Sequence, residues 1–317
     1  MMAILVDENT QVLVQGITGR EAQIRVRLMK EYGTQVVAGV TPGRGGQTVE
    51  GVPVYNSAEE AKEHHPGITV SSIFVPAQAA KTAAFETIDA GIGVITLHPE
   101  RVPQQDMLEV IAYARRGGAR VIGPNTIGLV SPGRCLVGMI GGRSDLAKEF
   151  FQPGPVGVIS RSGGNTTTLA YYLNMVGLGQ STAIGMGGDA FVGTTLIDLL
   201  TEFEKDDETE MVTFFGEIGT SVEEDAAEFI KAGGFTKPFV GYVSGRYARS
   251  DVRFGHAGAI VTRGRGTAQG KIEALRGAGA YMVDHFGEMG DVAFKFLAEY
   301  RNSRGKQKDG RSRNGQR

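Results

Sequence analysis

Short apolar runs alternate with amphipathic stretches along most of the chain. In the first half, runs rich in Val, Ile and Leu occupy 10–15, 34–40, 69–75, 93–97 and 120–125. The segments between them, at 20–33, 77–90 and 103–116, place their apolar residues at helical spacing. Short buried strands separated by helices predict a parallel sheet that is covered by helices on both faces.

The same alternation resumes in the second half after an interruption at 131–155. We expect strands at 157–161, 181–186, 211–219, 237–245 and 280–284, and helices near 164–176, 193–204, 222–232, 266–277 and 286–299. The sequence therefore predicts an α/β protein with two doubly wound parallel sheets in tandem. The expected boundaries are 1–130 for the first domain, 131–155 for the connection, 156–300 for the second domain and 301–317 for a tail.

Composition narrows the class of protein. The formal net charge of the 317 residues is −2, and the last 17 residues hold seven Lys or Arg and one Asp, so the remaining chain carries −8. We expect the basic tail to be disordered, and the acidic remainder gives no sign of a nucleic-acid partner. A single cysteine excludes a disulfide framework and makes a cysteine metal site improbable, so no metal site is expected on this chain. No apolar run is long enough to span a bilayer and no signal peptide is recognisable, which predicts a cytoplasmic protein without a membrane partner.

Glycines cluster where the predicted strands end, which is where backbone approaches a ligand closely. Gly16 and Gly19 follow the first strand and precede a helix, an arrangement that can cradle a phosphate or form a plain turn. Arg44, after the second strand, could pair with a phosphate or be an exposed loop residue. In the second domain Ser162, Gly163 and Gly164 stand between a strand and a helix and form a candidate anion site at the helix N-terminus.

Two further residues carry candidate chemistry. Glu217 ends an apolar strand, so its carboxylate is expected at the ligand-binding edge of the sheet, although it could also be a packing or capping group. His256 stands in "GHAG", where its neighbours contribute almost no side-chain bulk. This segment offers no further metal ligands, and the chain has no G-x-S-x-G hydrolase motif. A phosphoryl-carrying histidine therefore competes with a buried structural histidine.

Several motifs follow one another in the order and spacing of a known family. They are "VQGITG", "GVTPGRGG", "IGPNTIGLVSPG", "VGVISRSGG", "GQSTAIGMGGD", "FFGEIG" and "GHAGAI". Together they resemble the α-subunits of succinyl-CoA synthetase (succinate–CoA ligase) and related NDP-forming acid–CoA ligases. Some features resemble the citryl-CoA synthetase and ATP-citrate lyase branch. The resemblance covers residues 3–297.

The resemblance implies a Rossmann-like CoA-binding domain followed by a flavodoxin-like ligase domain. It makes His256 the phosphoryl carrier, Glu217 its carboxylate partner, and Ser162, Gly163 and Gly164 the phosphate-binding helix start. It also implies a set of residues that contact coenzyme A: Gly16, Thr18, Gly19, Arg20, Glu21, Pro42, Arg44, Val75, Pro76, His98, Pro99, Glu100 and Asn125.

The implied reaction proceeds through a phosphorylated His256 and an acyl phosphate to an acyl-CoA thioester. The chain has no G-x-x-x-x-G-K-[ST] loop. In the family, ATP or GTP and Mg²⁺ bind to a β-subunit with an ATP-grasp domain, so the resemblance implies an αβ or α₂β₂ enzyme.

The chain also departs from the succinate enzymes. The first turn reads "TGREA", Thr126 replaces a cysteine, and "SRSGGNTTT" places Thr167 where those enzymes have a tyrosine that reaches the acid. Succinate, malate, citrate and other small acids therefore all stay open as substrates. Two other classes remain as alternatives, a CoA-binding protein without catalysis and a nicotinamide-dependent oxidoreductase, and the second lacks G-x-G-x-x-G.

Overall fold

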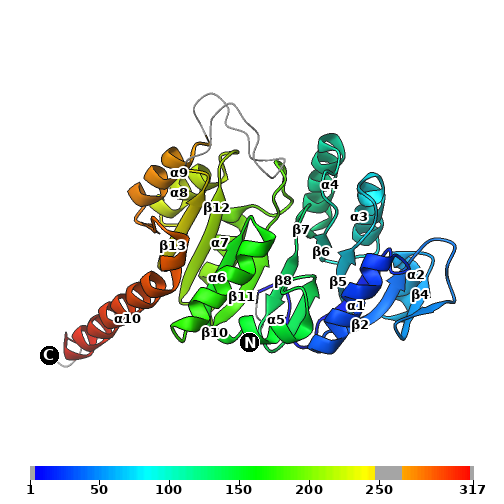
Figure 1. The fold of residues 1–317 in the computed structure, drawn as a ribbon, viewed down its shortest axis with the longest axis horizontal. Helices are drawn as coiled ribbons and strands as arrows, with labels where there is room; N and C mark the ends of the chain where they lie inside the picture. Colours follow the sequence, from blue (N-terminus) through cyan, green and yellow to red (C-terminus); the bar gives the residue numbers. More distant parts are fainter. Residues whose placement is uncertain (1–3, 247–265, 315–317) are drawn as a thin grey trace.

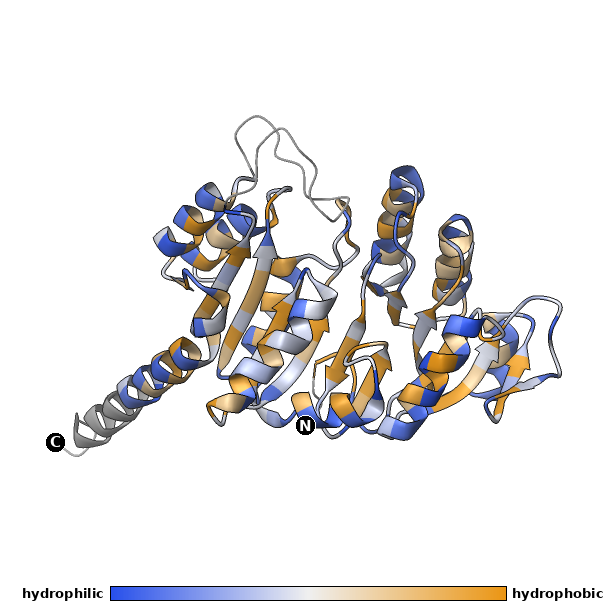
Figure 2. Ribbon diagram, viewed as in Figure 1, coloured by the Kyte–Doolittle hydropathy of each residue, from blue (hydrophilic) through white to orange (hydrophobic). Residues whose placement is uncertain are grey.

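Two sheets of mostly parallel strands lie side by side in the computed structural model, which describes residues 4–246 and 266–314 (Figure 1). Each sheet has seven strands within these ranges. This arrangement confirms the predicted α/β class with two doubly wound domains. Figure 2 shows that apolar residues concentrate on the strands, while polar residues lie mainly on the outer helices.

The first sheet has the strand order β3-β4-β2-β1-β5-β6-β7. The chain builds outward from β1 in one direction and then restarts at β5 on its other side, so the strand order reverses between β1 and β5. In open α/β sheets such a reversal leaves a crevice at the carboxyl ends of the two strands. The strands are β1 (Gln11–Gln15), β2 (Gln35–Val40), β3 (Thr48–Val49), β4 (Val52–Tyr55), β5 (Ile68–Ile73), β6 (Val94–Leu97) and β7 (Arg120–Ile122).

Helices α1, α3 and α4 of the first domain follow the predicted positions closely, whereas the short α2 was not predicted. In α1 (Arg20–Tyr32) the apolar residues Ala22, Val26 and Met29 recur at helical spacing and are buried. This helix ends at Gly33, whose left-handed backbone closes the last turn. The other helices are α2 (Ala58–His64), α3 (Ala80–Asp89) and α4 (Gln104–Gly117).

The second sheet has the strand order β14-β13-β12-β10-β11-β8-β9. Its reversal falls at β10, which pairs in parallel with β11 on one side and β12 on the other. The strands are β8 (Gly128–Ser131), β9 (Cys135–Gly138), β10 (Pro153–Ser160), β11 (Gln180–Gly185), β12 (Met211–Glu217), β13 (Phe239–Ser244) and β14 (Tyr281–Met282). Its helices are α6 (Gly163–Met175), α7 (Leu196–Lys205), α8 (Val222–Lys231), α9 (Ala268–Gly277) and α10 (Met289–Asn314).

The segment expected to be a connection, 131–155, contains β9 and begins at the last residue of β8. β8 pairs antiparallel with β11, and β9 pairs antiparallel with β8, so both extend the second sheet. The hydroxyl of Thr34 joins this edge to the first domain, because it donates to the carbonyl of Leu136 at 2.7 Å and accepts from the Leu136 N–H at 2.9 Å. A helix, α5 (Ser144–Phe150), completes the segment. Residues 131–155 are therefore structured and hold the two domains together.

The C-terminal segment also differs from expectation. Helix α10 continues to Asn314, across residues for which the composition predicted a disordered tail, and it runs away from the body of the molecule (Figure 1). Among the described residues, no helix has the length and apolar character that crossing a membrane requires.

Candidate active site

The crevice of the first sheet holds a cavity of about 350 Å³. Gly16 stands at its base with a left-handed φ of 73°, and a Cβ there would lie 2.6 Å from the carbonyl oxygen of Phe74. Only glycine fits both conditions without displacing backbone. The predicted contact residues that line the cavity are Gly16, Thr18, Gly19, Pro42, Val75 and Pro76, and they are joined by Gln15, Val40, Thr41, Phe74, Ala79, Thr82, Ala83 and Glu86.

Several predicted contact residues lie outside the cavity lining. Arg20, Glu21 and Arg44 are exposed, and Glu21 forms an ion pair with Arg25 one helical turn away. Glu100 is exposed as well, with its carboxylate 3.8 Å from the guanidinium of Arg101. These charged side chains are therefore on the surface and do not line the cavity.

His98 is buried and bonded within the protein. Its Nε2 lies 2.8 Å from the Ser72 hydroxyl and 3.0 Å from the Thr96 hydroxyl, and its Nδ1 lies 2.9 Å from the Thr126 carbonyl oxygen. Burial lowers the pKa of His98 to about 4. Both ring nitrogens are thus engaged, and the structure does not bring this imidazole into the cavity lining.

The second candidate region is the carboxyl edge of the second sheet, where β10 and β12 end side by side. Ser162 stands at the start of α6 and provides no side-chain cap, which leaves the first N–H groups of the helix to an anion. A Cβ on Gly163 would lie 2.5 Å from Ile127, whereas one on Gly164 would meet open space. Gly163 is therefore required by packing, and Gly164 keeps the approach to the helix start clear.

Glu217 is the last residue of β12 and is buried. Its Oε1 lies 3.2 Å from Nε of Arg161, a residue directly after β10 whose side chain is only 1% exposed. The pairing of Ser160 with Phe215 in the sheet brings the two residues to the same edge. A buried carboxylate needs such a countercharge, because removal from water without one is costly.

The main chain of Glu217 is held by a second buried ion pair. Its N–H donates to Glu223 Oε1 at 3.3 Å, and its carbonyl accepts from Lys271 Nζ at 2.9 Å. The side chains of Lys271 and Glu223 pair with each other and are fully buried. Lys271 also donates to the carbonyl of Gly219. The position of Glu217 is therefore fixed from both its side chain and its backbone.

Asp189, after β11, connects the two regions. One carboxylate oxygen accepts from Asn125 Nδ2 at 3.1 Å and the other from the Arg101 N–H at 3.2 Å. Asn125 and Arg101 both have left-handed backbones, with φ of 56° and 59°. The Asn125 N–H donates to the carbonyl of Pro99 at 3.0 Å. The predicted residue Asn125 thus belongs to the contact between the domains, and Pro99 holds its backbone.

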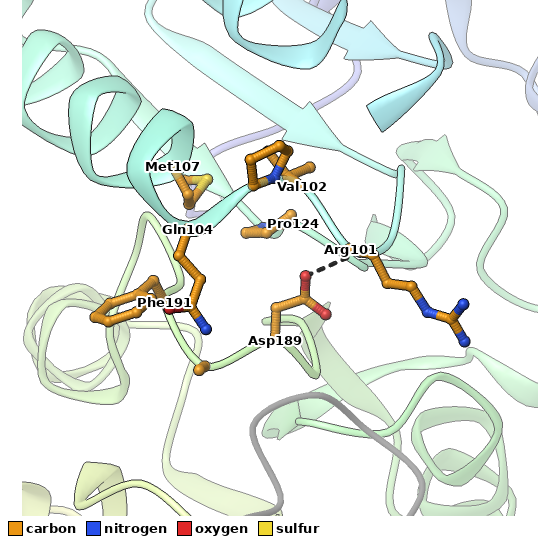
Figure 3. Close-up of a pocket in the computed structure, with 9 residues that line it drawn as sticks. Arg101, Val102, Gln104, Met107, Pro124, Asp189 and Phe191 are labelled. Atoms are coloured by element: carbon orange, nitrogen blue, oxygen red, sulfur yellow. Dashed lines mark hydrogen bonds between the residues drawn. The ribbon is translucent and has the colours of Figure 1, made fainter. Parts of the chain in front are cut away.

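A second cavity of about 230 Å³ opens at this contact. Figure 3 shows Asp189 pointing toward Arg101, with the side chains of Gln104 and Phe191 close by. Its lining comes from both domains: Arg101, Val102, Pro103, Gln104, Met107 and Pro124 from the first and Asp189, Ala190 and Phe191 from the second.

Sequence reasoning did not assign Arg161, Asp189, Glu223 or Lys271 to the site. A charged residue directly after a buried strand is the signal that could have selected Arg161, and Asp189 stands in the glycine-rich loop that follows β11. Thr167 is half-buried one turn into α6. His256, the predicted phosphoryl carrier, lies outside the described residues.

Comparisons with known proteins also divide the chain into two domains. Residues 7–100 match the CoA binding domain family, and residues 159–281 match the CoA-ligase family. The succinate–CoA ligase [ADP-forming] subunit alpha of Aquifex aeolicus is 46% identical over 298 residues, which are 93% of this chain and 95% of that protein. The corresponding subunit alpha 2 of Archaeoglobus fulgidus is 48% identical over 279 residues, which are 88% of this chain and 94% of that protein.

Solved structures show the same arrangement. ATP citrate lyase from Methanothrix soehngenii, in complex with citrate and coenzyme A, matches 96% of this chain with a TM-score of 0.87 and 27% identity. This chain spans only about half of that protein, 52% of its length. The dinucleotide-forming acetyl-coenzyme A synthetase 1 of Ca. Korarchaeum cryptofilum shares the fold, with a TM-score of 0.70 at 20% identity.

Proposed function

The chain belongs to the family of succinate–CoA ligase α-subunits, and from this we propose that it carries a phosphoryl group on His256 in an NDP-forming acid–CoA ligase. One observation carries the proposal beyond family membership. The start of α6 at Ser162, which lacks a side-chain cap, lies at the same sheet edge as the buried carboxylate of Glu217. A helix start that binds phosphate beside a carboxylate that can pair with imidazolium suits a phosphohistidine.

The proposed reaction has three displacements. A ring nitrogen of His256 attacks the γ-phosphorus of a nucleoside triphosphate, the bond to the β-phosphate oxygen breaks, and the nucleoside diphosphate leaves. A carboxylate oxygen of the acid then attacks the phosphorus, and the P–N bond breaks to give an acyl phosphate. The thiolate of coenzyme A finally attacks the carbonyl carbon, and inorganic phosphate leaves with the electrons of the C–O bond.

We propose the first-domain cavity as the site of coenzyme A. The residues present suit it, because Gly16 and Gly19 allow close backbone approach at a helix start, while Val75, Pro76 and Phe74 give an apolar wall. The first domain would bind and orient coenzyme A, which supplies the thiol. His98 would support the cavity from beneath without touching the ligand.

We assign the nucleotide-binding part of the active site to a partner subunit. We propose a β-subunit with an ATP-grasp domain that binds ATP or GTP with Mg²⁺, in an αβ or α₂β₂ assembly. The relatives from Aquifex aeolicus and Archaeoglobus fulgidus are both alpha subunits, which supports such a partner. Among the described residues no cluster of His, Cys, Asp and Glu could hold a metal ion.

Succinate is the proposed acid because the relatives from Aquifex aeolicus and Archaeoglobus fulgidus are succinate–CoA ligases. The structural likeness to a citrate-binding lyase and the threonine at position 167 keep citrate and malate as the second candidates. A CoA-binding protein without catalysis is the remaining alternative.

Labelling tests the proposal directly. The chain is co-expressed with its β-subunit, and the complex is incubated with Mg²⁺ and γ-labelled ATP or GTP. We expect acid-labile, base-stable label on this chain, absent from His256→Asn. Discharge of the label by succinate plus coenzyme A, compared with malate and citrate, identifies the acid. An assembled complex that takes no label from either nucleotide would refute the ligase mechanism and favour the non-catalytic alternative.

A further inference from the structure

The arginine beside the phosphate-binding turn faces inward. Arg161 directly precedes Ser162, a position from which an arginine would ordinarily be expected to reach a bound phosphate. Its side chain is instead 1% exposed and is used within the protein. An arginine so placed does not meet a substrate, so its influence must pass through the groups that it holds.

Those groups come from two loops at the carboxyl edge of the second sheet. Nη1 donates to the hydroxyl of Thr220, in the turn after β12, at 2.7 Å, and Nε lies 3.2 Å from Oε1 of Glu217, the last residue of β12. Nη2 donates to the carbonyl of Asp189, after β11, at 3.2 Å. The planar guanidinium therefore donates hydrogen bonds in two directions and places its charge beside the carboxylate in a third, which a single ammonium group does not do.

Two of these contacts hold backbone that is itself constrained. Thr220 has a left-handed φ of 54°, a conformation that costs a non-glycine residue energy unless its surroundings hold it. Asp189 is anchored on the first domain through Asn125 and Arg101. The guanidinium thus connects Glu217 to the loop that contains Asp189, and bonds from both domains hold that loop in place.

We propose that Arg161 is a positioning residue for phosphoryl transfer, which sets the carboxylate of Glu217 toward the histidine without touching phosphate, acid or nucleotide. This inference rests on the proposed function of Glu217 and His256. It assigns to Arg161 a role that depends entirely on Glu217. That dependence separates it from an arginine that binds phosphate directly and from one that only stabilises the fold.

A double-mutant cycle tests this dependence in the assembled αβ complex. The rate of single-turnover labelling from Mg²⁺–ATP, or from GTP if the wild type uses it, is measured for the wild type, Arg161→Gln, Glu217→Gln and the double variant. We expect Arg161→Gln to slow labelling about 100-fold, the scale that a small misplacement of a reacting group produces. In the Glu217→Gln background the same change should slow labelling by less than about threefold, because the group through which it acts is gone. Arg161→Lys should recover part of the rate.

The controls separate positioning from folding. Arg134 pairs with Glu208 through two bonds of 2.9 Å, and Glu208 precedes β12 whereas Glu217 ends it, so Arg134→Gln should label at the wild-type rate. Coenzyme A affinity should be unchanged in every variant. If Arg161→Gln does not assemble with the partner, Arg161→Lys replaces it in the double-mutant cycle.

The outcomes distinguish the inference from the function beneath it. In one outcome the wild type takes label and the double variant shows the product of the two single-variant rate losses. That result would overturn the positioning role and make Arg161 an independent contributor. A wild-type rate in Arg161→Gln would overturn it as well. A wild type that takes no label would refute the proposed function, and the role of Arg161 would fall with it.

Discussion

The imidazole of His98 lies almost flat on the ring of Phe74, with ring centroids 4.1 Å apart and an interplanar angle of 11°. Phe74 lines the first-domain cavity, whereas His98 is buried and bonded to Ser72, Thr96 and Thr126. The histidine therefore supports the cavity wall as a neutral ring. This arrangement couples the protonation of one side chain to the stability of the domain.

Stability should fall as the pH is lowered below about 6.5. Burial depresses the pKa of His98 from 6.5 to about 4, so between these values the unfolded chain binds a proton that the folded protein does not. The stability that the neutral imidazole contributes is thus present above pH 6.5 and lost as the pH falls toward 4. From pH 7 to pH 5 we expect this group alone to lower the free energy of unfolding by about 2 kcal/mol. Urea titrations at both pH values measure the change.

A His98→Asn variant serves as the control for that titration. It should be less stable than the wild type at pH 7, because bonds to a buried imidazole are lost. Its stability should change less between pH 7 and pH 5, since the titrating group is absent. An equal loss of stability in the variant and the wild type would show that other groups govern the acid sensitivity.

Substitution of Gly16 should separate ligand binding from backbone strain. Gly16→Ala places a Cβ 2.6 Å from the Phe74 carbonyl and strains a left-handed φ of 73°. Gly91 has nearly the same φ of 71°, but a Cβ there meets nothing within 4 Å. Both alanine variants should lose about 1 kcal/mol from the left-handed conformation alone. Calorimetry with coenzyme A should show weakened binding, at least tenfold, only for Gly16→Ala. Equal affinities in the two variants would place the coenzyme elsewhere.

The sequence predicted those features that depend on residues close together in the chain. The alternation of apolar runs predicted both doubly wound sheets, because hydrophobic periodicity is a local property. Gly16 was also predicted locally, from a strand followed by a glycine and a helix, and the structure places it at the base of the cavity. Gly163 follows the same logic at the start of α6.

Features that depend on distant partners were not predicted. Arg161 pairs with Glu217 across two neighbouring strands, and Asp189 reaches Asn125 across 64 positions. A charged residue after a strand can face solvent, a ligand or the interior, and only the fold decides among these. His98 illustrates the same limit, since no local pattern indicated its buried bonds to Ser72 and Thr126.

Loss of Lys271 should be strongly destabilising. Its ammonium is fully buried, pairs with Glu223 and donates to the carbonyl of Glu217. Lys271→Met leaves the carboxylate of Glu223 buried without its countercharge, which should cost about 3–5 kcal/mol in the free energy of unfolding. The double variant Lys271→Met, Glu223→Gln should recover a substantial part of this loss, because no buried charge is left unpaired.

A second ion pair offers the comparison for Lys271. Lys81 lies 2.7 Å from Asp106 on the surface, where water screens both charges. Lys81→Met should therefore change the denaturation midpoint far less than Lys271→Met does. Similar losses at the two sites would mean that burial of the Lys271 pair contributes little.

Thr167 should influence which acid is used without affecting phosphorylation. It lies one helical turn beyond the start of α6, the proposed phosphate site, and is half-buried, at the position where the resemblance implies a tyrosine in the succinate enzymes. Thr167→Val keeps the shape of the side chain and removes only the hydroxyl. If that hydroxyl bonds to the acid, its loss should raise the KM of the preferred acid about tenfold, the scale of one hydrogen bond to a charged group. Label on His256 should form at the wild-type rate, because phosphorylation of His256 precedes the reaction with the acid.

The neighbouring Thr168, whose hydroxyl donates to the Gly164 carbonyl at 3.3 Å, provides the matched variant Thr168→Val, which should leave every KM unchanged. Steady-state rates with succinate, malate and citrate measure these effects. Unchanged KM values for all three acids in Thr167→Val, or a loss of label, would remove Thr167 from the acid site and place selectivity on the partner subunit.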